Sequence, residues 1–170
     1  MKRESEYTIK EFSNSIDQNL LNQIFNINQE NTPEVGSLSS IQELSDLINL
    51  SSINYYVSFQ GDVIAFILCF KENSRYKSKN YKYFSNIETK FLYVDRVAVK
   101  DTFRHKGLGK KLYFLIESIA NEKNIPICCE INTLPPNEIS LRFHKSLGFY
   151  QIGQYNFKDH SVAYYKKFTQ

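Results

Sequence analysis

The residues best placed to do chemistry lie between a hydrophobic run and a helical pattern. The run ends at Val99, and the pattern opens with Gly107-Leu108-Gly109-Lys110. The start of a helix has unpaired backbone N–H groups and a partial positive charge, so it attracts an anion. Two glycines here remove Cβ atoms that would keep a phosphate away from the amides. Basic side chains surround the same point: Arg104, Lys106 and Lys110. The pattern predicts a phosphate or diphosphate cradle.

The spacing of the glycines excludes two common nucleotide-binding loops. Neither G-x-x-x-x-G-K-[ST] nor G-x-G-x-x-G occurs at this turn. Taken alone, a G-x-G after a strand is more often a glycine-softened turn with solvated basic residues. The surrounding elements must decide between the two interpretations.

Hydrophobic periodicity predicts how the chain positions the turn. Residues 91–99 are predicted as a strand, 107–123 as a helix with one apolar stripe, and 127–131 as a strand buried on both faces. This strand–helix–strand crossover is typical of an α/β domain, and we expect one domain over residues 1–170. Alternation along residues 91–99 places Asp95, Val97 and Val99 on one face and Val94, Arg96 and Ala98 on the other.

The remaining segments extend this sheet. The predicted elements are a strand at 7–9, helices from 16 to near 28 and from 40, a hairpin of 54–59 with 63–70, a helix at about 137–146, and a hairpin of 150–157 with 162–168. Residues 71–86 are polar, basic and tyrosine-rich without a period, so they are predicted to form a functional or mobile loop.

Composition excludes several classes of protein. The 170 residues are 42% hydrophobic and 23% charged, which is ordinary for a globular protein and not for a disordered one. The longest apolar stretch, residues 63–70, is far shorter than the roughly 20 residues of a membrane span. The first twenty residues lack the apolar core of a secretory signal, so we expect a cytoplasmic protein. A net charge of +3 without clustered bases argues against a nucleic-acid partner.

The three cysteines, Cys69, Cys128 and Cys129, have the spacing of neither a disulfide framework nor a zinc site. We interpret them as small core residues in a reducing compartment, and we expect no metal.

Two motifs flank the predicted crossover. Residues 104–109 (RHKGLG) have the form R-x-x-G-x-G, and residues 137–149 (NEISLRFHKSLGF) follow about thirty residues later. With the strand before them, these motifs resemble the GNAT acetyltransferase superfamily, specifically across residues 93–154, and the wider stretch is similar to a bacterial subgroup. The resemblance implies an α/β GNAT fold: a mixed central sheet of six to seven strands, splayed central strands and about four helices.

The same resemblance implies acetyl-CoA as cosubstrate. Backbone groups of Val97, Ala98 and Val99 would pair with the pantetheine arm, and an N–H at a bulge in that strand would polarise the thioester carbonyl. Asn137 would bond near the pantetheine, and the Phe143–His144 face would approach the sulfur. The turn residues would take the diphosphate: Arg104, His105, Lys106, Gly107, Leu108, Gly109 and Lys110.

Acetyl transfer to an amine needs a base for the amine and is helped by a proton for the departing thiolate. Asp95 is the first candidate for the base, and the alternative is that it pairs with a nearby Lys or Arg. Glu130 is the second candidate, because a carboxylate in so apolar a strand needs a partner or a role. His144 stands where the superfamily usually has the tyrosine acid. It is predicted to be the acid, a cofactor-binding residue or a packing residue, or it acts as base.

In this superfamily the acceptor is chosen by segments that correspond here to residues 26–38 and 75–84. Asn28 and Tyr81 are candidates to line an acceptor pocket, with an exposed polar loop as the alternative. We expect a small primary amine, such as an amino acid or polyamine, acetylated in a ternary complex. The alternatives are a non-catalytic acyl-CoA sensor and a protein N-acetyltransferase. The last hairpin is compatible with a homodimer.

Overall fold

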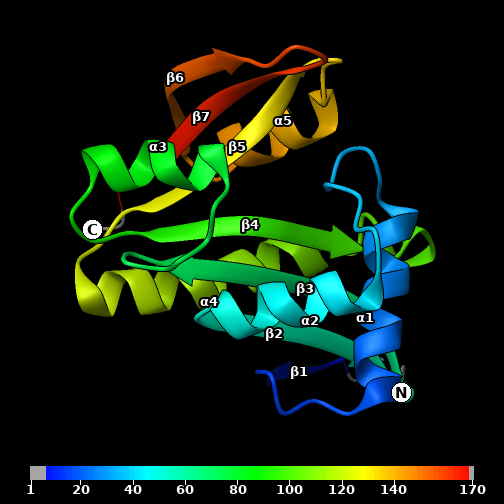
Figure 1. Cartoon of the computed structure of the whole chain (residues 1–170). Helices are drawn as coiled ribbons and strands as arrows, with labels where there is room; N and C mark the ends of the chain where they lie inside the picture. Colours follow the sequence, from blue (N-terminus) through cyan, green and yellow to red (C-terminus); the bar gives the residue numbers. More distant parts are fainter. Residues whose placement is uncertain (1–6, 169–170) are drawn as a thin grey trace.

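The strand segments assemble into one mixed seven-stranded sheet in the computed structural model, which describes residues 7–168. The strand order is β1-β2-β3-β4-β5-β7-β6 (Figure 1). All neighbours are antiparallel except β4 and β5. The strands are β1 Thr8–Glu11, β2 Ile53–Phe59, β3 Asp62–Lys71, β4 Leu92–Val99, β5 Ile127–Leu134, β6 Tyr150–Asn156 and β7 Ser161–Lys167.

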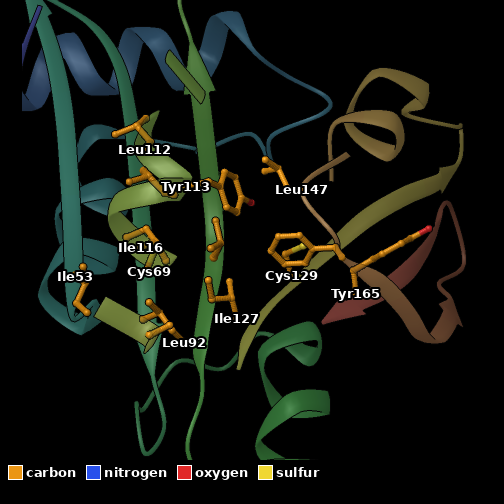
Figure 2. Close-up of a cluster of buried hydrophobic side chains, with 14 of the residues drawn as sticks. Ile53, Cys69, Leu92, Leu112, Tyr113, Ile116, Ile127, Cys129, Leu147 and Tyr165 are labelled. Carbon is orange, nitrogen blue, oxygen red and sulfur yellow. The ribbon is translucent and has the colours of Figure 1, made fainter. Parts of the chain in front are cut away.

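Helices cover both faces of the sheet, and the apolar residues divide into two cores. On one face, α4 (Leu108–Lys123) packs its buried stripe against β3, β4 and β5. Figure 2 shows Leu112, Tyr113 and Ile116 of this stripe beside Ile127 and Cys129 of β5. The opposite face is covered by α1 (Gln18–Glu30), α2 (Ile41–Leu50) and α3 (Lys79–Ile87). Helix α5 (Glu138–Ser146) joins the first core through Leu141 and Phe143.

The predicted α/β fold with splayed central strands is confirmed, with five α-helices among the described residues instead of about four. The additional helix is α3, which lies in the segment predicted to be a loop. The Ser78 side chain accepts from the amide of Tyr81, and Tyr81 and Phe84 are buried one helical turn apart. The lysines of this segment obscure its helical period in the sequence, because the period becomes clear only when the buried tyrosine and phenylalanine are known.

The three cysteines are free and buried, as predicted for core residues. Burial raises the pKa of all three thiols, which keeps them in the unreactive thiol form.

Candidate functional site

Strands β4 and β5 separate soon after they begin. They pair only at Leu92 with Ile127 and at Tyr93 with Cys128. β4 continues beside β3 to Val99, while β5 continues beside β7 to Leu134, so the two strands diverge (Figure 1). The edge of β4 that faces β5 therefore has no partner strand beyond Tyr93 among the described residues.

The backbone groups on this open edge belong to Val97 and Val99. The amide of Lys100 donates to the carbonyl of Ile64 at 2.8 Å, which fixes the hydrogen-bonding phase of the β3–β4 pair. Because the phase alternates along an antiparallel strand, Ala98 faces β3 and its two neighbours face the open edge. An extended ligand with amide groups can pair there as an additional strand does.

A β-bulge lies at Asp95, before the predicted position within residues 97–99. Leu68 is paired with Arg96 and Cys69 with Val94, so Asp95 is the extra residue. The bulge places Asp95 and Arg96 on the same face of the sheet, where they contact Tyr76 and Asn28.

The predicted alternation along this strand is therefore wrong across the bulge, although it holds from Arg96 to Val99. Val94 and Val97 both pack in the α4 core, while Ala98 lies in the core on the opposite face. The extra residue reverses the alternation, so Asp95 does not share the face of Val97.

The turn before α4 presents backbone amides to solvent. No side chain among residues 7–168 caps this helix, and the first intrahelical bond runs from the amide of Lys111 to the carbonyl of Gly107. The backbone is left-handed at Gly107 (φ 77°) and at His105 (φ 61°). The uncapped amides and the exposed basic side chains beside them fit an anionic diphosphate.

The two glycines of the turn have different roles. A Cβ on Gly107 would meet nothing within 4 Å, so this glycine is needed for its positive φ and leaves open space in front of the amides. A Cβ on Gly109 would lie 3.4 Å from the ring of Phe143. Helix α5 therefore packs directly on the first turn of α4, which brings the two sequence motifs together.

An acidic cluster lies on the face covered by α3, with one carboxyl group from each diverging strand. The hydroxyl of Tyr76 donates to Asp95 Oδ1 at 2.9 Å, and Arg96 Nε lies 2.8 Å from Asp95 Oδ2. The hydroxyl of Tyr93 donates to Glu130 Oε2 at 2.7 Å. Both oxygens of Asp95 are thus engaged, and its side chain is 5% exposed. This geometry favours the ion-pair alternative for Asp95.

Glu130 has the properties of a base that works near neutral pH. Burial, helped by the negative charge of Asp95, raises the pKa of Glu130 to about 8, although hydrogen bonds from Tyr93 and Asn80 oppose the rise. The group therefore changes between acid and carboxylate in the range where a general base is most effective.

His144 is a buried residue with both ring nitrogens engaged. Nδ1 lies 2.8 Å from the carbonyl oxygen of Ser140, which only accepts, so Nδ1 carries a proton. Nε2 then accepts from the hydroxyl of Tyr113 at 2.6 Å. Burial lowers the pKa of His144, and the ring is neutral. This geometry favours the packing role, and the acid role stays a prediction.

We expect His144→Phe to lower the free energy of unfolding by about 1–3 kcal/mol at pH 8, because the buried Tyr113 hydroxyl loses its acceptor. Urea unfolding measures this loss. The lowered pKa of His144 means that the unfolded chain binds a proton first as the pH falls below 6.5, so the wild type loses stability there. In His144→Phe, the loss of stability below pH 6.5 that comes from His144 should be absent.

The double variant Tyr113→Phe/His144→Phe is the control, because it removes both partners and should recover part of the stability. An unchanged unfolding curve for His144→Phe would contradict the packing role, whereas a large drop in kcat of the folded variant would favour the acid role.

Three further candidates are occupied within the fold. Asn28 is fully buried, with its amide group bonded to Gln29, Gly36 and Arg96. The Tyr81 hydroxyl donates to the carbonyl of Lys71 at 2.6 Å and accepts from the amide of Ser74. These contacts favour structural roles for Asn28 and Tyr81. Asn137 caps α5 through its Oδ1, which accepts from Ser140.

Sequence reasoning missed the residues that hold the carboxyl groups: Tyr76, Asn80 and Tyr93. Tyr76 and Asn80 lie in the segment predicted to be a loop. The available signal was Ser78 three residues before Tyr81, which is a helix-capping spacing.

The model of the acetyltransferase (GNAT) family matches residues 21–149. The chain belongs to this family. As a GNAT enzyme it is an acyltransferase that moves an acetyl group from acetyl-CoA. The match spans α1 to α5 and includes both the turn before α4 and the acidic cluster.

Solved structures support the fold of this GNAT enzyme. Ard1 from Thermoplasma volcanium is 21% identical with a TM-score of 0.72, covering 96% of this chain and 98% of that one. An aminoglycoside 6'-N-acetyltransferase complexed with coenzyme A is 15% identical with a TM-score of 0.70, covering 96% and 97%. The ribosomal-protein-S18-alanine N-acetyltransferase from Escherichia coli is 15% identical with a TM-score of 0.68, covering 96% and 94%.

Residues 7–168 lack two further features. They contain no group of three or more His, Cys, Asp or Glu side chains arranged to hold a metal ion. None of their helices combines the length and apolarity that crossing a bilayer requires.

Proposed function

We propose that this GNAT enzyme acetylates the primary amine of a small molecule by direct attack in a ternary complex. The observation that carries the proposal is the acidic cluster at the separation of β4 and β5, with Glu130 as base. A carboxylate on the sheet face beside the open edge of β4 attracts a cationic amine and can take its proton.

Bound acetyl-CoA supplies the thioester whose acetyl group is transferred. We assign its diphosphate to the amides at residues 105–110, which no described side chain caps, and its pantetheine arm to Val97 and Val99, which no described strand pairs on the edge facing β5. Arg104 lies beside the turn and is shared between Asp101 and Asn31. Its guanidinium would add positive charge beside those amides and so help to hold the diphosphate.

Glu130 and its neighbours then supply the proton chemistry. Once the amine is neutral, its nitrogen forms a bond to the acetyl carbon and the carbon–sulfur bond breaks, which releases coenzyme A as a thiolate. The proton that the nitrogen loses passes to the Glu130 carboxylate directly or through water, and the thiolate takes up a proton from the solvent. Tyr93 holds the carboxylate in place by its hydrogen bond. The negative charge of Asp95 contributes to the raised pKa of Glu130.

The segment around α3 supports a small acceptor. It reaches both diverging arms: Tyr76 contacts Asp95 on β4, and the Tyr164 hydroxyl on β7 donates to Asn80 at 3.0 Å. Tyr83 stacks on Tyr164 with 3.9 Å between ring centroids. These contacts fix α3 across the sheet face that carries Asp95 and Glu130 and restrict the room there for an extended chain.

A panel of amines with acetyl-CoA tests the function, with release of the free thiol as readout. We expect turnover with an amino acid or polyamine that exceeds turnover with peptide N-termini at least tenfold. Preference for the peptides would establish a protein N-acetyltransferase, and acetyl-CoA binding without turnover on any amine would establish an acyl-CoA sensor. The homodimer and the cytoplasmic location stay predictions; β6 is an edge strand, which leaves it free for a second copy.

A further inference from the structure

The loop between α1 and α2, residues 31–40, is already fixed without an acceptor; we call it the acceptor loop. The Asn28 amide nitrogen donates to the carbonyl of Gly36 at 3.1 Å. Gln29 bonds both backbone groups of Leu38, at 3.1 Å from its amide and 3.0 Å from its carbonyl. The last turn of α1 thus holds the far side of its own loop.

One guanidinium connects this arrangement to β4. Arg96 Nη1 donates to Asn28 Oδ1 at 2.7 Å and to the carbonyl of Gly36 at 2.9 Å, while Nε pairs with Asp95 at 2.8 Å. Arg96 is 9% exposed, and the carboxylate of Asp95 compensates its charge. A planar fork with several donors can serve a carboxylate, an amide and a carbonyl at once, which a lysine ammonium on its flexible stem cannot do in this geometry.

The bulge at Asp95 makes this contact possible. In regular alternation Arg96 would point into the α4 core, away from the acceptor loop. The bulge directs it to the loop instead, one residue before Val97, whose backbone faces the open edge. The same short stretch of β4 therefore fixes both the loop and the position proposed for the thioester.

The beginning of the loop has a second anchor on the same strand. The side-chain nitrogen Nδ2 of Asn31 donates to the carbonyl of Val99 at 3.4 Å, and Asn31 Oδ1 accepts from Arg104 Nη2 at 2.6 Å. The loop is thus held at two points, its first residue and Gly36, and both are hydrogen-bonded to residues of β4.

We infer that Arg96 is a positioning residue for the acceptor: it fixes the acceptor loop against β4 before the acceptor binds and so sets acceptor specificity. The inference rests on the proposed function for its kinetic consequence, because a preformed wall selects acceptors that fit it. A loop released from β4 admits other amines and holds the preferred one less well.

Arg96→Lys is the test, because it keeps the charge beside Asp95 and removes the fork. We expect the KM for the preferred amine to rise at least tenfold. The ratio of kcat/KM between the best and the second-best amine should fall at least threefold, with the Kd for acetyl-CoA within twofold. In hydrogen exchange, protection of the Leu38 amide should fall at least tenfold. The control Arg142→Lys changes an exposed arginine on α5 and should alter none of these.

The kinetic and exchange readouts separate two failures. An acceptor KM, a discrimination ratio and a Leu38 protection all within twofold of wild type would overturn the role of Arg96. Absence of turnover on every amine by the wild type would instead overturn the proposed function, and Leu38 exchange would then decide whether Arg96 holds the loop. Should Arg96→Lys not fold, Asn28→Ala leaves the Asp95–Arg96 pair in place and is expected to give the same changes.

Discussion

Glu130→Gln is expected to lower kcat by about 10²–10⁴-fold at pH 9, because the amide cannot accept the proton of the amine. The substitution keeps the size of the side chain and an oxygen that can accept from Tyr93. The Kd for acetyl-CoA should stay within twofold, since the diphosphate turn and the open edge of β4 are unchanged. Steady-state kinetics and equilibrium binding measure the two quantities.

The pH dependence of the wild type follows from the same residue. The base must be deprotonated to act, and the pKa of Glu130 is raised to about 8. For an acceptor whose amine has a pKa near 10, kcat/KM should therefore decrease as the pH falls below 8. The decrease has two causes, protonation of the amine and protonation of the Glu130 carboxylate. In Glu130→Gln, the part of the decrease in kcat/KM that comes from protonation of residue 130 near pH 8 should be absent.

Two variants test this assignment. Tyr93→Phe removes a hydrogen bond that lowers the pKa of Glu130, so the limb near pH 8 should shift to higher pH. Glu117→Gln changes a glutamate on α4 that pairs with Lys167, and kcat should stay within twofold. A Glu130→Gln enzyme with wild-type kcat and an unchanged pH profile would remove Glu130 from the mechanism.

Gly107→Ala is expected to weaken acetyl-CoA binding by about 5–30-fold. A left-handed backbone costs a residue with a Cβ about 1–2 kcal/mol, so alanine at φ 77° favours another conformation in the free protein. Binding must then restore the turn that directs the amides at the diphosphate, and that cost appears in the Kd. Isothermal titration with acetyl-CoA measures the change.

Gly61→Ala is the matched control for Gly107→Ala. Gly61 also has a positive φ, 90°, and open space at its Cβ, but it lies between β2 and β3. Both substitutions should lower thermal stability by a similar amount, and only Gly107→Ala should change the Kd. Equal effects of the two variants on acetyl-CoA binding would show that the turn before α4 does not hold the diphosphate.

Local sequence patterns determined most of the fold and the proposed cosubstrate half of the site. Periodicity predicts the strand ending at Val99 and the helix after Gly107, and glycine spacing predicts the turn between them. These features depend on neighbours in the chain. The family motif added acetyl-CoA because it lies in the same continuous segment.

The tertiary structure alone decided the proposed acceptor half of the site. The bulge at Asp95 depends on how β3 pairs with β4, and one extra residue reverses every side chain beyond it, which alternation within one strand cannot reveal. Asp95, the first candidate for the base, is found in an ion pair with Arg96, and Glu130 gains its raised pKa from burial and from a charge on another strand. These properties come from residues distant in sequence, since charge and burial act through space.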